Sequence, residues 1–327
     1  MSDEYLDDLH RKLASVPENS FIYKHNDCPK DHSCFSENLS VKSKGKGLIE
    51  TYLLYPGIEL SFCFISADKI IFKHRKSTNA IEINYCRFGR SARELKDGSS
   101  VFLGPGDVSF NLTDECADSE LNLPLGFFEG ITINMELDKM DGNYPEILSG
   151  SGITGEWLKQ KFCPEKKATA IHGSERIEHI FDVLWELPEK LCIPYFKCKI
   201  IEFLLFLARG DYSVGKELTE YRSDQAEIIK QIHDYLLDNL DKRITIEALS
   251  KKFLINTTTI KNLFKSVYGV PIAAHIKKHR MEKAAVLLKE TNNTVSAIAR
   301  SVGYESQSKF TNAFKEFYKM TPNEYRK

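Results

Sequence analysis

Two stretches near the C-terminus carry hydroxyl, amide and ammonium side chains at matching positions. The first set is Thr258, Asn262 and Lys265, and its counterparts are Ser308, Asn312 and Lys315. Residues spaced by three or four positions share one face of a helix, so each stretch would present these groups together. Such groups donate and accept hydrogen bonds and neutralise anions, which makes a polyanion the expected partner.

These positions belong to an internal repeat. Residues 245–268 align with residues 294–318 at an offset of 49, which becomes 50 after the turn. Leu249 then corresponds to Ile298, and Phe264 to Phe314. Each copy predicts a short helix, a turn and a second helix, the arrangement in which the second helix enters the major groove of DNA. The repeat therefore predicts two helix-turn-helix units in an all-α C-terminal domain.

Small and capping residues are expected to shape each unit. We expect Ala248 and Ala297 to let the paired helices cross closely, and Thr257 and Ser306 to cap the second helices. Gly303 would form the second turn. The expected core positions are Leu249, Ile260, Leu263, Phe264, Ile298, Phe310, Ala313 and Phe314.

The polar faces supply the candidate DNA contacts. These are Thr257, Thr258, Lys261, Asn262, Lys265, Arg300, Gln307, Ser308, Lys309, Asn312 and Lys315. Asparagine can read the edge of adenine, whereas lysine and arginine hold phosphates or guanine. The alternative is an ordinary solvated helix face, which the matched repeat makes less attractive.

The segment between the copies has the length of a groove-spanning connector. Residues 271–290 predict a helix of about 30 Å at roughly 1.5 Å per residue, with Pro271 in its first turn. Successive major-groove segments lie roughly 34 Å apart. One chain could therefore place two helices in adjacent groove segments.

Charge divides the chain in the same way. The 327 residues have a net charge of −1, but residues 224–327 hold 18 Lys and Arg against 11 Asp and Glu, a net of +7. Residues 1–223 hold the remaining 27 basic and 35 acidic residues, a net of −8. A basic module on an acidic body is typical of a DNA-binding domain joined to a domain with another task.

Composition argues against membrane and secreted classes. The most apolar segment, residues 200–208, contains Glu202 and is too short to span a bilayer. The acidic N-terminus lacks the apolar stretch of a signal peptide. We therefore expect a cytoplasmic protein without membrane contact, whose eight cysteines stay reduced.

The first two thirds of the chain predict a β-rich domain followed by helices. Between Leu48 and Leu137, short β-branched and aromatic runs alternate with Gly/Pro turns, as in a sandwich or small barrel. Helices follow at 174–187 and 195–209. We expect a multi-domain α+β protein: an N-terminal segment at 1–45, a β-rich domain with C-terminal helices at 46–212, a linker at 213–224 and the DNA-binding domain at 225–327.

Two groups of metal-ligand residues lack a complete pattern. His275 and His279 are four residues apart on the connecting helix, but no third ligand is evident in the sequence. His25, Cys28, His32 and Cys34 are close together but fit no regular zinc spacing. We therefore predict no metal and no cofactor.

The C-terminal sequence closely resembles the signature of AraC/XylS transcription regulators. The resemblance covers about residues 228–327 and includes Gly303 in the turn, the pattern Ser306/Phe310/Phe314/Lys315, Thr321-Pro322 and Tyr325-Arg326. It implies sequence-specific binding to double-stranded promoter DNA, control of transcription and no enzymatic activity. It also implies an N-terminal domain that binds a small effector and forms a homodimer, with RNA polymerase as a further partner.

The same resemblance predicts a cupin-like barrel with an effector site. The metal-binding histidine cluster of metal cupins is absent from residues 48–140, where His74 stands alone. Candidate effector contacts are Phe62, His74, Tyr85, Arg87 and Glu129, which could instead be core or surface residues. Candidate dimer contacts on the second helix are Ile201, Leu204, Leu205 and Ala208, with packing on the barrel as the alternative.

Two departures from the family pattern concern helix ends. Lys319 stands where the family has glycine, at a cost of about 1 kcal/mol if the backbone there is left-handed. Leu254 stands where the second copy has Gly303. Other hypotheses are a regulator that answers to a protein partner, metal or redox state, and a methyl-accepting DNA-repair protein, which would need clustered cysteines.

Overall fold

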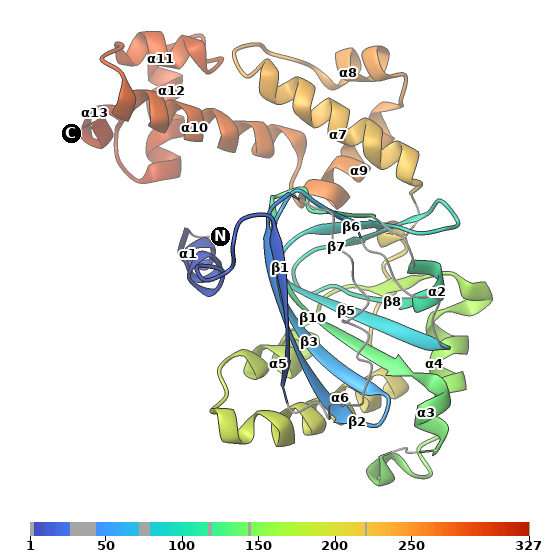
Figure 1. Ribbon diagram of the computed structural model, residues 1–327. Helices are drawn as coiled ribbons and strands as arrows, with labels where there is room; N and C mark the ends of the chain where they lie inside the picture. The colour runs from blue at the N-terminus through green and yellow to red at the C-terminus, as the bar shows by residue number, and fades with distance from the viewer. Residues whose placement is uncertain are drawn as a thin grey trace. The chain divides into compact units, whose positions relative to one another are not determined.

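The chain divides into two compact units, Met1–Ser223 and Asp224–Lys327. The computed structural model describes residues 3–26, 44–71, 79–116, 120–142, 145–219 and 221–326. The predicted α+β class, with a β-rich N-terminal part and two helix-turn-helix units in a helical C-terminal part, is confirmed (Figure 1). The cupin-like detail stays a prediction. Among the described helices none is long and apolar enough to cross a membrane.

The first unit contains two sheets and a set of surrounding helices. Its strands are β1 (Ser20–Asn26), β2 (Lys46–Tyr55), β3 (Ile58–Ser66), β4 (Lys69–Ile71), β5 (Ala80–Gly89), β6 (Ser91–Glu94), β7 (Ser100–Leu103), β8 (Val108–Leu112), β9 (Glu120–Asn122), β10 (Phe127–Glu136) and β11 (Thr169–Ile171). Its helices are α1 (Asp3–Lys12), α2 (Thr113–Cys116), α3 (Leu137–Gly142), α4 (Gly155–Phe162), α5 (Glu175–Asp182) and α6 (Cys192–Arg209).

The larger sheet has seven strands in the order β1-β2-β3-β10-β5-β8-β11. The smaller sheet has four, in the order β4-β9-β6-β7. At the centre of the larger sheet β10 pairs antiparallel with β3 and β5, so that Thr132 lies between Ser61 and Asn84. Because side chains alternate across a strand, this register assigns each residue of the sheet to one of two faces.

One face of the larger sheet is apolar and carries the main core. Strand residues such as Leu60, Ile83 and Ile133 pack there with α5 and α6. Phe196 of α6 lies 5.0 Å from Tyr52 and 5.4 Å from Phe62, measured between ring centres. The helices are therefore fixed to the sheet by aromatic contacts, each contributing beyond its buried area.

Two predicted helices, 174–187 and 195–209, correspond to α5 and α6, with some shifted ends. Ser174 caps α5, with its hydroxyl accepting a hydrogen bond from the Ile177 N–H, and Gly210 ends α6 at φ = 81°. The predicted helix 174–187 is shorter than expected, since α5 ends at Asp182 and a 3-10 turn, Val183–Trp185, follows.

The predicted N-terminal segment, residues 1–45, contributes α1 and β1 to the first unit. Strand β1 pairs in parallel with β2, and Leu9, Leu13 and Val16 are buried in the main core. Leu9, Leu13 and Val16 are separated by four and three residues, a helical spacing that begins in α1 and continues past its end.

The second unit is helical throughout its described length. Its helices are α7 (Ser223–Asp238), α8 (Ile246–Phe253), α9 (Thr257–Tyr268), α10 (Ile272–Glu290), α11 (Val295–Ser301), α12 (Gln307–Tyr318) and α13 (Pro322–Arg326). Helices α8 and α9 form the first helix-turn-helix, and α11 and α12 form the second. The connector α10 buries Met281, Ala284 and Leu288 against Phe310 and Phe314 of α12, in the second helix-turn-helix.

Candidate functional site

Helices α9 and α12, here called the recognition helices, each bury one face and expose the other. Ile260, Leu263 and Phe264 of α9 are fully buried, as are Phe310 and Phe314 of α12. The opposite faces expose Thr258, Lys261, Asn262 and Lys265 on α9, and Gln307, Ser308, Lys309, Asn312 and Lys315 on α12. Arg300 at the end of α11 is also exposed, and Thr257 is half-buried.

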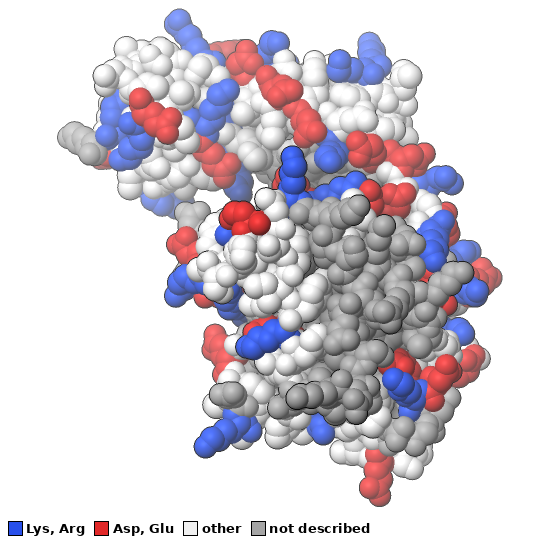
Figure 2. Space-filling model, viewed as in Figure 1, with Lys and Arg blue, Asp and Glu red and all other residues white. Residues whose placement is uncertain are grey.

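Several exposed side chains on the recognition helices make no polar contact with another part of the described chain that a ligand would have to displace. Within the described part of the chain, the side chains of Asn262, Asn312 and Lys315 make no hydrogen bond or ion pair. Their donors and acceptors therefore face water and are available to a ligand. Acidic side chains also occur here, since Glu316 of α12 pairs with Lys277 at 2.6 Å, and Figure 2 shows both charges interspersed on the viewed face of this unit.

The N-terminal ends of the recognition helices are capped by side chains. The Ser306 hydroxyl accepts a hydrogen bond from the Lys309 N–H at 3.3 Å, which confirms the predicted cap. In the first helix-turn-helix the cap is Asn256, which accepts from the Thr259 N–H at 2.8 Å, so the prediction of Thr257 is wrong. Asn256 and Ser306 are 50 residues apart, because the extra residue of the second copy precedes the cap.

The expected role of two small residues is also wrong. Ala248 and Ala297 are exposed rather than buried at a helix crossing. Each lies in the first turn of its helix, where its N–H donates to a threonine cap, Thr245 or Thr294. The buried positions are the next ones along, Leu249 and Ile298.

The turns and helix ends adopt left-handed backbone at equivalent positions. Leu254 has φ = 55° and Gly303 has φ = 79° between the paired helices. Gly269 has φ = 80° after α9, and Lys319 has φ = 60° after α12. The conditional prediction for Lys319 is thus met: a residue with a Cβ occupies a left-handed cap.

Arg280 of α10 joins the two halves of the second unit. Its guanidinium donates to the carbonyl of Lys242 at 2.8 Å and to that of Gly303 at 3.5 Å. A Cβ at Gly303 would lie 2.5 Å from both the Leu240 carbonyl oxygen and the Arg280 guanidinium. The turn of the second helix-turn-helix therefore needs glycine for its φ and for space.

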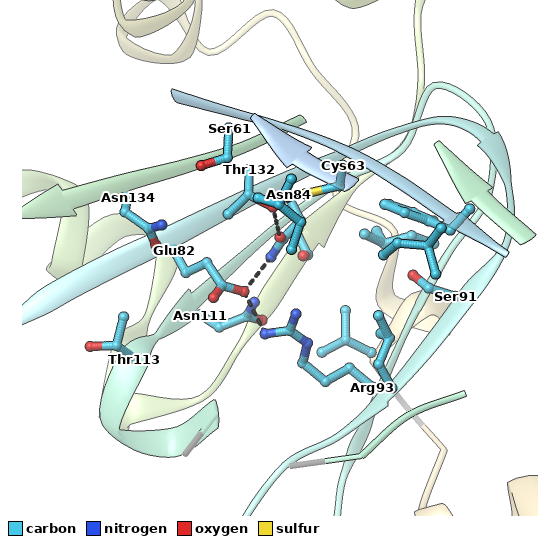
Figure 3. A pocket seen from close by; sticks show the side chains of 17 residues that line it. Ser61, Cys63, Glu82, Asn84, Ser91, Arg93, Asn111, Thr113, Thr132 and Asn134 are labelled. Atoms are coloured by element: carbon cyan, nitrogen blue, oxygen red, sulfur yellow. Dashed lines mark hydrogen bonds and ion pairs between the residues drawn. The ribbon is translucent and has the colours of Figure 1, made fainter. Parts of the chain in front are cut away.

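A second candidate site is a cavity within the first unit. It lies between the larger sheet and the smaller one, and the empty space there is about 880 Å³ when the part open to solvent is included (Figure 3). Its polar lining consists of Ser61, Cys63, Glu82, Asn84, Ser91, Arg93, Ser109, Asn111, Thr113, Thr132 and Asn134. Its apolar lining consists of Ile49, Ile65, Val101, Leu103, Leu121 and Phe128.

The polar lining arises from strand register. Ser61, Thr132, Asn84 and Ser109 form one row across four strands, and Asn134, Glu82 and Asn111 form the next. These residues occupy the face opposite the main core, where alternation would ordinarily place solvent. The rows are nevertheless sheltered, because the smaller sheet faces them.

A hydrogen-bond network links most of the polar groups. The Arg93 guanidinium pairs with Glu82, the Asn84 amide donates to Glu82 at 2.7 Å, and the Thr132 hydroxyl donates to Asn84 at 2.9 Å (Figure 3). The Asn111 Oδ1 atom is buried without a partner in the described structure. A buried unpaired acceptor is costly, so it is a natural position for a ligand donor.

Comparison with known proteins identifies the second unit. A helix-turn-helix domain model matches residues 249–327. The TetD protein of transposon Tn10 from Escherichia coli is 34% identical over 32% of this chain and 77% of its own length. MarA, the multiple antibiotic resistance protein of Salmonella typhimurium, is 30% identical over 32% of this chain and 83% of its own. The chain belongs to the AraC/XylS family of transcription regulators.

The first unit of this AraC-family protein lies outside these matches. YkgA of Escherichia coli K12 is 33% identical over 34% of this chain, and the match spans 46% of that relative, less than half its length. The family assignment thus rests on the second unit. What the first unit contributes has to be argued from its own residues.

The predicted effector residues of this AraC-family protein do not line the cavity. Phe62 and Tyr85 lie in the main core on the other face of the sheet, with Tyr85 stacked on Phe181. Glu129 is buried and pairs with Arg87 at 2.8 Å. His74 lies outside the described residues. The sequence did not predict the cavity residues, because polar residues at alternate strand positions usually face solvent. Polar residues recur at such alternate positions in four strands, and this recurrence could have indicated a shared polar surface.

The candidate dimer residues on α6 divide between core and surface. Ile201 and Leu204 are buried in the main core. Leu205 is 46% exposed, and Ala208 is exposed one turn further on. Packing on the sheet therefore accounts for half of the predicted set, and the other half is available for association.

The second unit also brings together three histidines. His275 and His279 of α10 lie beside His233 of α7, so a third imidazole that the sequence did not reveal comes from another helix. Burial, aided by the neighbouring His279 and His233, lowers the pKa of His275 to about 3, which keeps it neutral near pH 7. Of the other predicted cluster, His25 lies on β1, whereas Cys28, His32 and Cys34 lie outside the described residues.

Proposed function

We propose that this AraC-family regulator binds promoter DNA through the recognition helices and couples that binding to a small polar effector in the cavity. The observation that carries the DNA part is the matched pair of exposed polar faces on α9 and α12. Their asparagines suit adenine edges, and their lysines suit phosphates. Arg300 and Lys265 would position the protein on the duplex instead of selecting its sequence.

The connector supports simultaneous use of both helices. The 19 residues of α10 extend about 28 Å, compared with roughly 34 Å between successive major-groove segments. We propose that α9 and α12 occupy two such segments on one face of the duplex.

Binding to DNA is tested by footprinting the full-length protein on fragments from upstream of its own and neighbouring genes. We expect protection of two sites about one helical turn apart. The logarithm of the binding constant should fall linearly with the logarithm of salt concentration, with a slope of about −0.9 per phosphate contact. Absent protection, or binding insensitive to salt, would contradict the proposal.

The cavity chemistry indicates the effector class. Asn111 needs a donor, and the Asn134 amide offers both a donor and an acceptor. Ser61 is already bonded to Thr51, and Asn84 to Glu82 and Thr132. The apolar end beside Phe128 and Leu121 suits a short hydrocarbon part. We propose a small molecule with hydroxyl or amine donors and a limited apolar portion.

A thermal-shift screen of polar metabolites against the full-length protein tests this class. A true effector should raise the melting midpoint and change the affinity for DNA, in either direction. Ligands that stabilise the protein without any change in DNA affinity would argue against the coupling.

Association, location and lack of catalysis complete the proposal. We propose a cytoplasmic, non-enzymatic homodimer in which the exposed stripe of α6 around Leu205 contributes to the interface, with RNA polymerase as a partner on the promoter. Light scattering of the wild type and of Leu205→Glu tests the interface. A monomeric wild type, or a variant that dimerises equally well, would exclude this surface.

A further inference from the structure

Three imidazole rings from two helices meet in the second unit. His233 lies on α7, and His275 and His279 lie four residues apart on α10. One potential ligand nitrogen from each ring lies within 4.8 Å of the others. The Nε2 atoms of His275 and His279 are 3.0 Å apart.

This separation is close to what a tetrahedral metal requires. Zinc binds imidazole nitrogen at about 2.0–2.1 Å, which places two ligand nitrogens roughly 3.3 Å apart around the ion. The pair on α10 is already near that value. The His233 nitrogen lies within 4.8 Å of the other two and would have to move closer to them when an ion binds.

Carboxylates contact the Nδ1 atoms of two of the rings. The Nδ1 atom of His233 lies 3.1 Å from Asp234, and that of His279 lies 3.3 Å from Glu282. Each contact occupies Nδ1 and leaves Nε2 for another partner. Carboxylates that accept from the second nitrogen of a histidine are the usual support of protein zinc sites.

Packing restricts the rings while leaving an entry path. His233 stacks on Tyr268, with ring centres 4.4 Å apart and an angle of 12° between planes. His275 is 5% exposed, but His233 and His279 are half-buried. An ion could therefore reach the cluster from solvent. A shared hydrogen bond between His275 and His279 explains that pair, but it does not explain the third ring or both carboxylates.

We propose that His233, His275 and His279 form a binding site for one divalent transition metal ion, with Zn²⁺ as the preferred ion. Three neutral imidazoles suit zinc, and the fourth position would be taken by water. The ion would join α7, the first helix of the second unit, to the connector α10. Metal binding would then stabilise the first helix-turn-helix, whatever the effector of the first unit is.

Titration of the full-length, untagged protein with Zn²⁺ and Co²⁺ after chelator treatment tests the site. We expect one ion per chain, a higher melting midpoint and a visible cobalt spectrum of tetrahedral type. An all-histidine site lacks thiolate-to-cobalt charge transfer in the near ultraviolet. A near-ultraviolet charge-transfer band would place the ion on cysteine thiolates instead and overturn the proposal, as would the absence of stoichiometric binding.

Variants locate the ion. His279→Gln should weaken binding by at least about 100-fold, and Asp234→Asn by about 10–100-fold through loss of the supporting carboxylate. Asp234 is 62% exposed, so its variant should fold even if His279→Gln does not. The matched control is His179→Gln on α5, an exposed histidine outside the cluster, which should bind like the wild type. Unchanged affinity in both test variants would exclude the site.

Discussion

At the scale of single residues, asparagine amides are found in two opposite environments. Asn262 and Asn312 are exposed on the recognition helices, whereas Asn111 is 1% exposed and has an unpaired oxygen. An exposed amide does not destabilise the free protein, because water satisfies its hydrogen bonds until a base edge takes the place of that water. A buried unpaired amide oxygen destabilises the ligand-free protein and increases the affinity for a ligand that donates a hydrogen bond to it.

Asn312 and Lys315 should affect DNA binding in different ways. Asn312→Ala should cost about 1–3 kcal/mol at the base pair it contacts and relax sequence preference there. Lys315→Ala should weaken binding to all sequences and reduce the salt slope by about one. Titration of the footprinted site and its single-base variants over a range of salt separates these outcomes.

Lys230→Ala provides the control for loss of one charge outside the recognition helices. Lys230 is exposed on α7. If it matched Lys315→Ala in affinity and salt slope, Lys315 would have no special contact with phosphate.

At the scale of elements, the two helix-turn-helix units reach the same shape with different residues. At the turn between the paired helices, the second helix-turn-helix has Gly303 and the first has Leu254. After the recognition helix, the first has Gly269 and the second has Lys319. All four residues have left-handed backbone. The strain is tolerated because the flanking helices are fixed by buried apolar residues, such as Leu249 of α8 and Phe264 of α9.

Leu254→Gly should stabilise the second unit by about 1 kcal/mol, because it relieves a left-handed backbone. Leu254 is 92% exposed, so little packing is lost. Denaturant unfolding of the full-length protein measures the change. A lower stability of the variant would show that the leucine makes a contribution that its exposure conceals.

Gly303→Ala should have the opposite effect and a larger one. It would place a Cβ 2.5 Å from the Leu240 carbonyl oxygen in addition to straining φ. Gly210→Ala is the matched control, since Gly210 has φ = 81° with nothing within 4 Å of its Cβ. We expect about 1 kcal/mol of destabilisation for the control and clearly more for Gly303→Ala. Equal losses in unfolding experiments would mean that the turn adjusts freely.

At the scale of the whole molecule, each unit has its own core and its own candidate site. The first unit divides the larger sheet into an apolar face under helices and a polar face around the cavity. The second unit exposes two polar helix faces. Regulation then requires a ligand in the first unit to alter the affinity of the second for DNA.

Asn111→Leu should separate the stability of the first unit from its response to effector. Without ligand, removal of the unpaired oxygen should raise stability by about 1–3 kcal/mol. The variant should also lose the ligand-induced rise in melting midpoint and the change in DNA affinity. Asn134→Leu, at a half-buried lining position, should give a smaller gain. A fully responsive Asn111→Leu protein would place the effector elsewhere.

The sequence alone determined the helical unit almost completely. Local spacing fixes helix faces, so the repeat, the Ser306 cap, the Gly303 turn and the buried Phe264, Phe310 and Phe314 could all be predicted. The first unit was predictable as a class for the same reason, since short β-branched runs between Gly/Pro turns predict strands. The predicted cap of α9, Thr257, is one residue away from the observed cap, Asn256, because asparagine and threonine can both cap a helix.

Tertiary structure decided what brings distant residues together. Strand alternation assigns residues to two faces, but only the placement of the second sheet shows that Glu82, Asn84 and Asn111 face a cavity. Likewise, His275 and His279 are neighbours through helix periodicity, whereas His233 joins them because α7 packs on α10. Sequence spacing encodes contacts within an element, and contacts between elements depend on how the whole chain packs.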